Sequence, residues 1–292
     1  MTEVFADALM DAAVDTVKLI PFLFITYLVM EYLEDKAGDR TTEMLAKVGR
    51  FGPLFGGAAG ILPQCGFSAA AASLYSGGVI TAGTLLAVFL STSDEMLPIF
   101  ISKAVAADTI ARILVCKAVL GAVTGLFLDF LLLYVFRRRG SGLRIHELCE
   151  QEHCGCEGEE EGGILKPALT HTFHITLFIF LITFVISFLV GLAGEETMSS
   201  FLTGKPVLGV FLAGIIGLIP NCAASVMITE LYLRGLLGTG QMMTGLLVGA
   251  GVGLLVLFRT NRRMRDNLSL LGVLYASGVF WGLLIELSGI TF

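Results

Sequence analysis

Charged residues are scarce in this chain. They make up 15% of its 292 residues, against 55% hydrophobic residues, and the mean hydropathy is +0.83. An ordinary soluble domain carries about 25% charged residues. A chain of this length could not bury so much apolar side chain in an aqueous core. The composition therefore argues against a soluble enzyme, a nucleic-acid binder and a disordered scaffold, and it predicts an all-α polytopic membrane protein.

Several sequence signatures are also missing. No basic stripe indicates a nucleic-acid partner, and no Walker motif indicates direct use of ATP. The first residues are acidic, unlike the basic start of a cleavable signal peptide. Neither Cys65 nor Cys222 has a partner at Cys-x-x-Cys spacing, which argues against a thiol oxidoreductase. We therefore expect no enzyme activity and no cofactor, and we interpret the six cysteines as thiols.

Six apolar runs reach the length of about 20 residues that a membrane-spanning helix needs. They are Val14–Leu33, Thr81–Ile101, Ile110–Phe136, Thr172–Ala193, Leu236–Phe258 and Leu268–Leu287. Two more runs, Phe51–Gly78 and Val207–Gly235, are each interrupted by a Pro-x-Cys sequence. Proline bends a helix and frees a carbonyl group. Each interrupted run is therefore expected to form a re-entrant hairpin of two half-helices or two short tilted spans, giving about ten helices in all.

Basic residues gather in three connecting segments, at 36–50, 137–139 together with Lys166, and 259–265. Cytoplasmic loops of membrane proteins are enriched in Lys and Arg. We therefore expect all three segments in the cytoplasm and both termini outside.

The chain contains an internal repeat. The sequence from Gly60 to Ser68, GILPQCGFS, resembles the sequence from Gly217 to Ser225, GLIPNCAAS, at a constant offset of 157 (217 − 60 = 157). Each unit has an odd number of crossings, so the two copies face opposite ways. We expect a first transmembrane repeat at 1–136, a cytoplasmic loop at 137–167 and an inverted second repeat at 168–292. In transporters built this way, broken helices meet near the midplane and form the substrate site.

Polar residues at the two Pro-x-Cys breaks are candidate ligands. Cys65 and Cys222 are expected near the N-termini of half-helices, which favour a thiolate. Thiolates bind soft metals and arsenic(III)-like centres. Neutral oxygen ligands would come from Gln64, Ser68, Asn221 and Ser225. The alternative is that these small residues allow helices to pack closely.

An acidic pair, Asp94 and Glu95, follows Ser91 within a predicted span. A continuous helix from Thr81 would place the pair about 20 Å along the span. Carboxylates within a membrane usually mark an ion or proton path. We therefore expect Ser91, Asp94 and Glu95 to bind the ion or exchange protons, or alternatively the acids to cap a half-helix near the outer interface.

Histidines and further cysteines form two other candidate metal sites. His171 and His174 share a helix face by their spacing, where they would bind a metal, shuttle protons or be solvated. The central loop holds His146, Cys149, His153, Cys154 and Cys156, followed by glutamates. Clustered thiol and imidazole groups can enclose a cation such as zinc. The alternative for this segment is a flexible acidic loop with incidental cysteines.

Four motifs together resemble the ten-helix heavy-metal exporter family, whose members are labelled manganese transporters or arsenic efflux proteins. The motifs are PQCGFS from Pro63, STSDE from Ser91, HT from His171 and PNCAAS from Pro220. The resemblance implies a bacterial or archaeal cytoplasmic-membrane permease without ATPase domains. The site residues it implies are Gln64, Cys65, Ser91, Asp94, Glu95, His171, Asn221, Cys222 and Ser225.

We therefore expect a secondary exporter of a metal or metalloid ion, coupled to protons at Asp94 or Glu95. Manganese would favour the oxygen ligands, and a soft cargo the thiols of Cys65 and Cys222. The expected partners are the ion, protons, the lipid bilayer and a second copy of the chain. Two alternatives stay open, a passive channel with an amide filter and a carrier of small anions or organoarsenicals attracted by helix N-termini.

Overall fold

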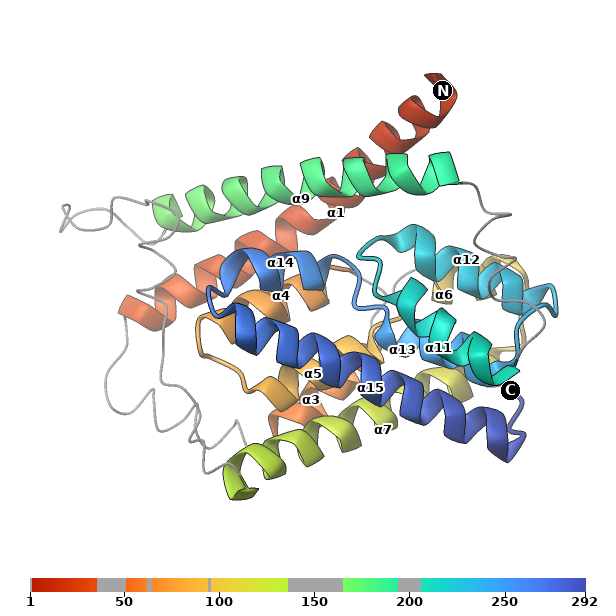
Figure 1. Ribbon diagram of the computed structural model, residues 1–292. Coiled ribbons are helices and arrows are strands. Elements are labelled where there is room, and N and C mark those ends of the chain that lie inside the picture. The colour runs from red at the N-terminus through yellow and green to blue at the C-terminus, as the bar shows by residue number, and fades with distance from the viewer. Residues whose placement is uncertain (1, 36–50, 62–64, 94–95, 136–164, 194–205) are drawn as a thin grey trace.

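The computed structural model describes residues 2–35, 51–61, 65–93, 96–135, 165–193 and 206–292 (Figure 1). The regular elements in these ranges are helices, and no strand occurs among them. The first half contains α1 (Thr2–Asp35), α3 (Gly52–Ala59), α4 (Cys65–Ser76), α5 (Ala82–Ser91), α6 (Met96–Ser102), α7 (Ala107–Phe130) and the π-helix η1 (Leu131–Val135). The second half contains α9 (Leu165–Ala193), α11 (Pro206–Gly217), α12 (Cys222–Leu233), α13 (Thr239–Val248), α14 (Val252–Thr260) and α15 (Met264–Ser288). The predicted all-α class is confirmed.

The helices repeat at the offset found in the sequence. The starts of α4 and α12 differ by 157 (222 − 65), as do those of α5 and α13 (239 − 82) and of α7 and α15 (264 − 107). Trp281 of α15 donates a hydrogen bond from Nε1 to Thr124 Oγ1 of α7 at 2.9 Å, and these two residues are also 157 positions apart. Equivalent positions of the two copies therefore meet at this contact. The predicted repeat extends far beyond the Pro-x-Cys motif.

The first Pro-x-Cys stretch forms a re-entrant hairpin, in which α3 enters and α4 leaves at the same end of the molecule. α3 runs beside α5 in the same direction, because Gly52 lies against Thr84 near the start of α5 and Gly60 lies against Ser91 at its end. Only residues 77–81 separate the end of α4 from the start of α5. The structure thus decides between the two predicted alternatives in favour of a hairpin.

The two hairpins open toward opposite ends. At the end of α4, the Ser76 hydroxyl lies 2.7 Å from that of Thr260 at the end of α14. At the other end, Lys103, which follows α6, forms a 3.2 Å ion pair with Glu230 of α12. Both contacts join one repeat to the other, and the opposite openings confirm the inverted plan.

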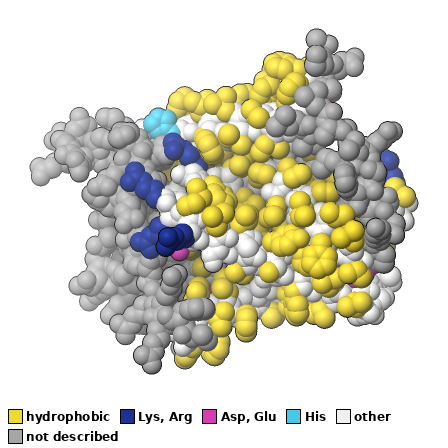
Figure 2. Space-filling view, viewed as in Figure 1, with side chains coloured by type: hydrophobic (Ala, Val, Ile, Leu, Met, Phe, Trp, Pro, Cys, Tyr) yellow, Lys and Arg dark blue, Asp and Glu magenta, His cyan; other side chains and the backbone are white. Residues whose placement is uncertain are grey.

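Large apolar side chains are exposed on several of the described helices, among them α1, α7, α9, α11 and α15. Within the described part of the chain, five stretches are long and apolar enough to cross a membrane: Ala82–Ser102, Ala107–Tyr134, Ala168–Phe188, Thr239–Thr260 and Met264–Ser288. The predicted span at 14–33 falls within α1, whose start meets the end of α9 through the edge-on rings of Phe5 and Phe184, 5.3 Å apart. Every fourth residue of α7 from Val115 to Phe127 is a large exposed apolar side chain. Such a surface suits lipid rather than water, and the chain is a multi-pass membrane protein (Figure 2).

Basic side chains collect at one end of this apolar surface (Figure 2). Arg259, Arg262, Arg263 and Arg265 are all exposed there, around the turn from α14 to α15. The end of α1, the end of α7 and the start of α9, which border the other two basic segments, lie toward the same end (Figure 1). The start of α1 and the end of α15 lie toward the opposite end. This arrangement is the one that the predicted orientation requires, while the side of the membrane stays a prediction.

Two spans that the sequence predicts as continuous are broken in the middle. α5 ends at Ser91 and α13 at Val248, before the helix resumes as α6 and α14. The prediction of one continuous helix from Thr81 is therefore wrong, while Asp94 and Glu95 themselves lie outside the described residues. At the end of α5, the Ser91 and Thr92 hydroxyls bond back to the carbonyls of Ala87 and Val88 at 2.7 Å. Such bonds favour a bend but also occur within continuous helices here, as from Thr124 to Leu120.

The second break has a different local sequence. It consists of Gly249-Ala-Gly251, where Gly251 has φ 54, a conformation that glycine adopts without steric strain. Each repeat thus contains two interruptions, one at the hairpin tip and one in the following span.

Candidate functional site

The chain interruptions meet in the middle of the molecule. Gly60, at the inner end of α3, lies against Ser91 where α5 ends. A Cβ added at Gly253, near the start of α14, would lie 2.8 Å from the Cβ of Ser68 in α4. A Cβ added at Gly249 would lie 3.5 Å from Ser225 Oγ in α12. Residues just beyond both Pro-x-Cys motifs therefore adjoin the second break, and the first hairpin adjoins the first break.

The hairpin helices α4 and α12 begin at Cys65 and Cys222, as predicted. Asn221 caps α12, since its Oδ1 accepts a hydrogen bond from the Ala223 amide at 3.3 Å. Its Nδ2 donates to Ser187 Oγ of α9 at 2.8 Å, and the residue is 4% exposed. The predicted ligand Asn221 thus uses both of its amide atoms to hold the start of α12 against α9.

The three predicted serine ligands lie in close helix contacts. Ser68 and Ser91 are completely buried, and Ser225 is half-buried. The Ser91 hydroxyl donates to the carbonyls of Ala87 and Val88, with a longer contact of 3.4 Å to Gly56 of α3. Ser91 therefore lies where a small side chain allows α3 and α5 to pack closely, which was the alternative to a role as a ligand.

Most of the predicted metal ligands lie outside the described residues. These are Gln64, Asp94, Glu95 and the loop residues His146, Cys149, His153, Cys154 and Cys156. The backbone of Cys65, Cys222 and His171 lies in described helices, but their side chains do not belong to the described part. His174 is exposed on α9, with its ring 6.2 Å from that of Phe173. Among described side chains no three His, Cys, Asp or Glu groups come together, so the metal-ligand set stays a prediction.

A buried lysine at the centre was missed by the sequence analysis. Of the charged side chains that the structure describes, Lys117 is the one that is fully buried, with 0% exposure. It follows the start of α7 by ten residues (117 − 107 = 10), which is roughly 15 Å of helix and about half the thickness of the bilayer core. The available signal was a single lysine inside the apolar run Ile110–Phe136. Charged residues at such positions are rare and usually functional.

Lys117 joins the ends of the two broken spans. Its ammonium group donates hydrogen bonds to the carbonyl of Thr92, directly after α5, and to that of Leu246 in the last turn of α13 at 3.0 Å. The C-terminal ends of helices carry partial negative charge. One ammonium group therefore compensates equivalent helix ends from both repeats.

Two carboxylates hold the opposite ends of the same spans. Asp129 of α7 accepts hydrogen bonds from the Gly83 amide at 2.8 Å and from the Thr81 hydroxyl at 2.6 Å, at the start of α5. Glu286 of α15 accepts from the Gly240 amide at 2.9 Å, at the start of α13. The two acids differ by the repeat offset (286 − 129 = 157), so the offset applied to acidic residues would have found them. They anchor the spans that lead to the centre.

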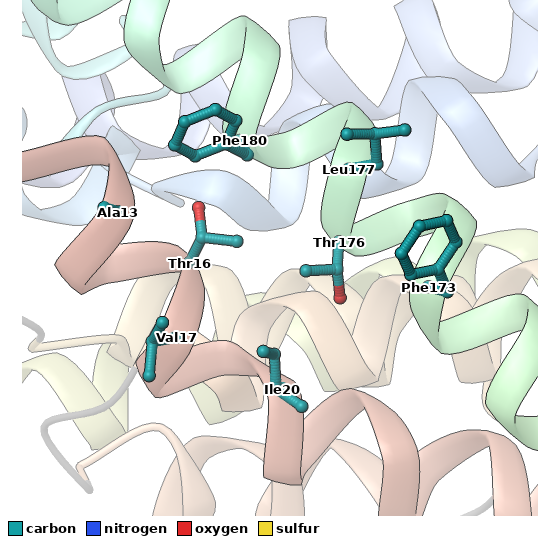
Figure 3. A pocket seen from close by; sticks show the side chains of 8 residues that line it. All are labelled: Ala13, Thr16, Val17, Ile20, Phe173, Thr176, Leu177 and Phe180. Carbon is teal, nitrogen blue, oxygen red and sulfur yellow. The ribbon is translucent and has the colours of Figure 1, made fainter. Parts of the chain in front are cut away.

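Two other features lie away from this centre. Glu230 pairs with the exposed Lys103 and Arg234 at one end of the molecule. A cleft between α1 and α9 is lined mainly by apolar side chains, with the buried hydroxyls of Thr16 and Thr176 (Figure 3). It has no charged lining residue, and so it does not suit an ion.

Comparison of the chain with protein-family models, curated proteins and solved structures finds no match. A functional assignment therefore depends on the sequence motifs and on the geometry of the centre.

Proposed function

We propose that this protein is a secondary-active exporter of a metal or metalloid ion across the cytoplasmic membrane of a bacterium or archaeon. The observation that supports this most is the meeting of broken helices from two inverted repeats around one buried centre. Inverted repeats with discontinuous helices at the midplane are typical of secondary transporters, where helix ends and unwound backbone bind the cargo and coupling ions.

The cargo is proposed from ligand chemistry and from the resemblance to heavy-metal exporters. α4 and α12 begin at cysteines, and the partial positive charge of a helix N-terminus favours an anionic group. A soft ion such as Cd(II) or As(III) would bind the thiolates, whereas Mn(II) would favour the carboxylates of Asp94 and Glu95.

Coupling and movement follow from the same plan. Exchange of protons at Asp94 or Glu95 would supply the driving force. Rocking of one repeat against the other would open the centre first to one side and then to the other. Both ends of the molecule have contacts between the repeats that such a movement would have to break, at Ser76–Thr260 and at Lys103–Glu230.

The deciding experiment is transport by purified protein in proteoliposomes with an imposed pH gradient. Mn(II), Zn(II), Cd(II) and As(III) would be offered in turn to the wild type, to the double variant Cys65→Ser/Cys222→Ser and to Asp94→Asn. Cys116→Ser is the matched control, because its thiol lies on α7 and packs against the apolar core. We expect saturable, gradient-dependent transport of at least one ion, lost in one test variant and kept in the control.

Each outcome identifies a different mechanism. Loss in the cysteine variant places a thiophilic cargo at the hairpin helices, and loss in Asp94→Asn alone places an oxygen-preferring cargo at the acidic pair. Transport that ignores the gradient excludes proton coupling, and flux without saturation or counterflow identifies a channel. Deleting residues 146–156 should lower the apparent affinity without abolishing transport, if the loop collects metal.

A second candidate function, a small-anion permease, is favoured by one observation. Lys117 places a buried positive charge where the two broken spans end, and a buried positive charge could bind an anion, as helix N-termini do. The contacts of Lys117 argue for the cation exporter, because its ammonium group already faces the negative ends of α5 and α13.

A further inference from the structure

The two carbonyl groups that contact Lys117 are made available by the breaks in the spans. In a continuous helix the Leu246 carbonyl would accept a hydrogen bond from the amide of Ala250. That amide instead donates to the carbonyl of Val248 at 2.8 Å. Thr92 directly follows the last residue of α5 and begins the first break. Both oxygens thus belong to the unsatisfied C-terminal carbonyls that every helix end presents.

These oxygens have the chemistry of a site for a hard metal cation. Backbone carbonyls are ligands that sodium-like and divalent hard cations accept. In transporters with broken helices, unwound carbonyls and the C-terminal ends of half-helices coordinate such ions. Here the two oxygens come from repeat-equivalent spans, and each lies at a negative helix end. The ammonium group of Lys117 occupies the position between them.

We propose that the Thr92 and Leu246 carbonyls form a cation-binding site in which Lys117 is a tethered substitute for a hard metal cation. The metal ion enters only when the ammonium group leaves. This inference rests on the proposed transport function. It adds the carbonyl of Leu246 and the side chain of Lys117, which no sequence motif contains, to the backbone of Thr92 within the STSDE motif. It also gives a role to a charged side chain at this depth, where a charge without compensating partners would strongly destabilise the fold.

The arrangement links occupancy to movement. Lys117 belongs to α7 of the first repeat, whereas Leu246 belongs to α13 of the second. With the ammonium group in place, the two repeats are held together at the centre. A metal ion that replaces the ammonium group frees α7 from α13 but joins the Thr92 carbonyl to that of Leu246, so exchange of the two cations transfers the link between the repeats from α7 to the break after α5.

The test is equilibrium binding of metal ions to the purified Lys117→Met variant. Methionine keeps an unbranched side chain of similar length but removes the charge, and the carbonyls are left without their cation. We expect binding of Mn(II) or Na(I) to become about tenfold tighter or more than in the wild type. Lys117→Arg, which keeps the charge, should show no such gain. Arg112→Met is the matched control, because it removes one positive charge at an exposed site on the same helix.

Two probe ions distinguish two versions of the site. If the variant binds Mn(II) more tightly than the wild type does, the site belongs to the cargo. If it binds Na(I) more tightly, the site belongs to a coupling ion. Unchanged or weaker binding of both ions to a folded, monodisperse Lys117→Met protein overturns the proposal. Loss of arsenate binding in the same variant would also overturn it, since Lys117 would then be the partner of an anion. If Lys117→Met does not fold with either ion present, Lys117→Gln is measured by the same criteria.

Binding and transport separate this inference from the proposed function. A wild type that exports Mn(II), together with a Lys117→Met variant that gains no affinity, leaves the function standing and removes the lysine-occupied site. If instead the variant gains affinity and the wild type transports no ion of the panel, the lysine-occupied site stands and the proposed transport function is removed.

Discussion

At the scale of single residues, three charged side chains lie at helix ends of the opposite sign. Asp129 and Glu286 accept hydrogen bonds from the first amides of α5 and α13, and Lys117 donates to carbonyls at their other ends. At both ends of each broken span, a side-chain charge therefore faces a helix end that carries the opposite partial charge. Because the bilayer core offers no water to these groups, such side chains replace solvent.

The carboxylate caps should contribute measurable stability. We expect Asp129→Ala and Glu286→Ala each to lower the free energy of unfolding by about 1 kcal/mol, the usual cost of losing an N-cap. Since the two acids cap opposite ends of the molecule, the double variant should lose about the sum. Unfolding in mixed detergent micelles measures this. Asp108→Ala is the control, because its ion pair with Arg112 is exposed and contributes little; equal losses in the control would contradict the capping role.

The sequence predicted some of these residue-scale features and missed others for a physical reason. The helix starts at Cys65 and Cys222 were predictable, because proline ends one helix and the next begins within a few residues. The contacts of Lys117 and Asp129 join residues 25 to 129 positions apart. Such contacts depend on how the helices pack, which local sequence patterns do not contain. The repeat offset was the available substitute for Asp129 and Glu286.

At the scale of helices, close approach through small residues determines where the breaks meet. α14 crosses α4 at Gly253, where the neighbouring atoms are Ser68 and the ring of Phe89. Packing of this kind, with small residues at the contact, is typical of helices in membranes. The sequence predicted the hairpins because proline is conspicuous. It did not predict the breaks after Ser91 and Val248, since serine, threonine and glycine also occur in continuous membrane helices.

A methyl group at this crossing should separate the two helices. In Gly253→Ala the new Cβ would lie 2.8–2.9 Å from Ser68 and Phe89, and we expect a loss of roughly 1–3 kcal/mol in stability from overpacking. Gly272→Ala is the control on α15, because nothing lies within 4 Å of its Cβ. Alanine favours a helix over glycine by about 1 kcal/mol, so the control should be neutral or more stable. A lower melting temperature for Gly272→Ala than for Gly253→Ala would refute this account of the crossing.

At the scale of the whole molecule, the position of the basic end predicts the orientation in the membrane. Arg259, Arg262, Arg263 and Arg265 lie at the end where the first hairpin opens, and basic loops face the cytoplasm. In a cysteine-free background, a membrane-impermeant maleimide added to intact cells should label Asp108→Cys but not Arg263→Cys. Lysis should make Arg263→Cys reactive, and the reverse pattern would invert the assignment.

Alternating access requires the contacts between the repeats at the two ends of the molecule to break one after the other. The hydroxyls of Ser76 and Thr260, 2.7 Å apart, are close enough for a disulfide after Ser76→Cys/Thr260→Cys. At the other end, Lys103→Cys/Glu230→Cys can be joined by a short reducible cross-linker. Either link should stop transport in proteoliposomes, and a reducing agent should restore it, since a repeat fixed at one end cannot rock. The four single-cysteine variants are controls and should transport normally under oxidising conditions.

Adding the ion should change the cross-linking rates at the two ends in opposite directions, because opening one end closes the other. Full transport with a complete Ser76–Thr260 disulfide would mean that the repeats do not separate there, and the ion would have to pass through a fixed pore.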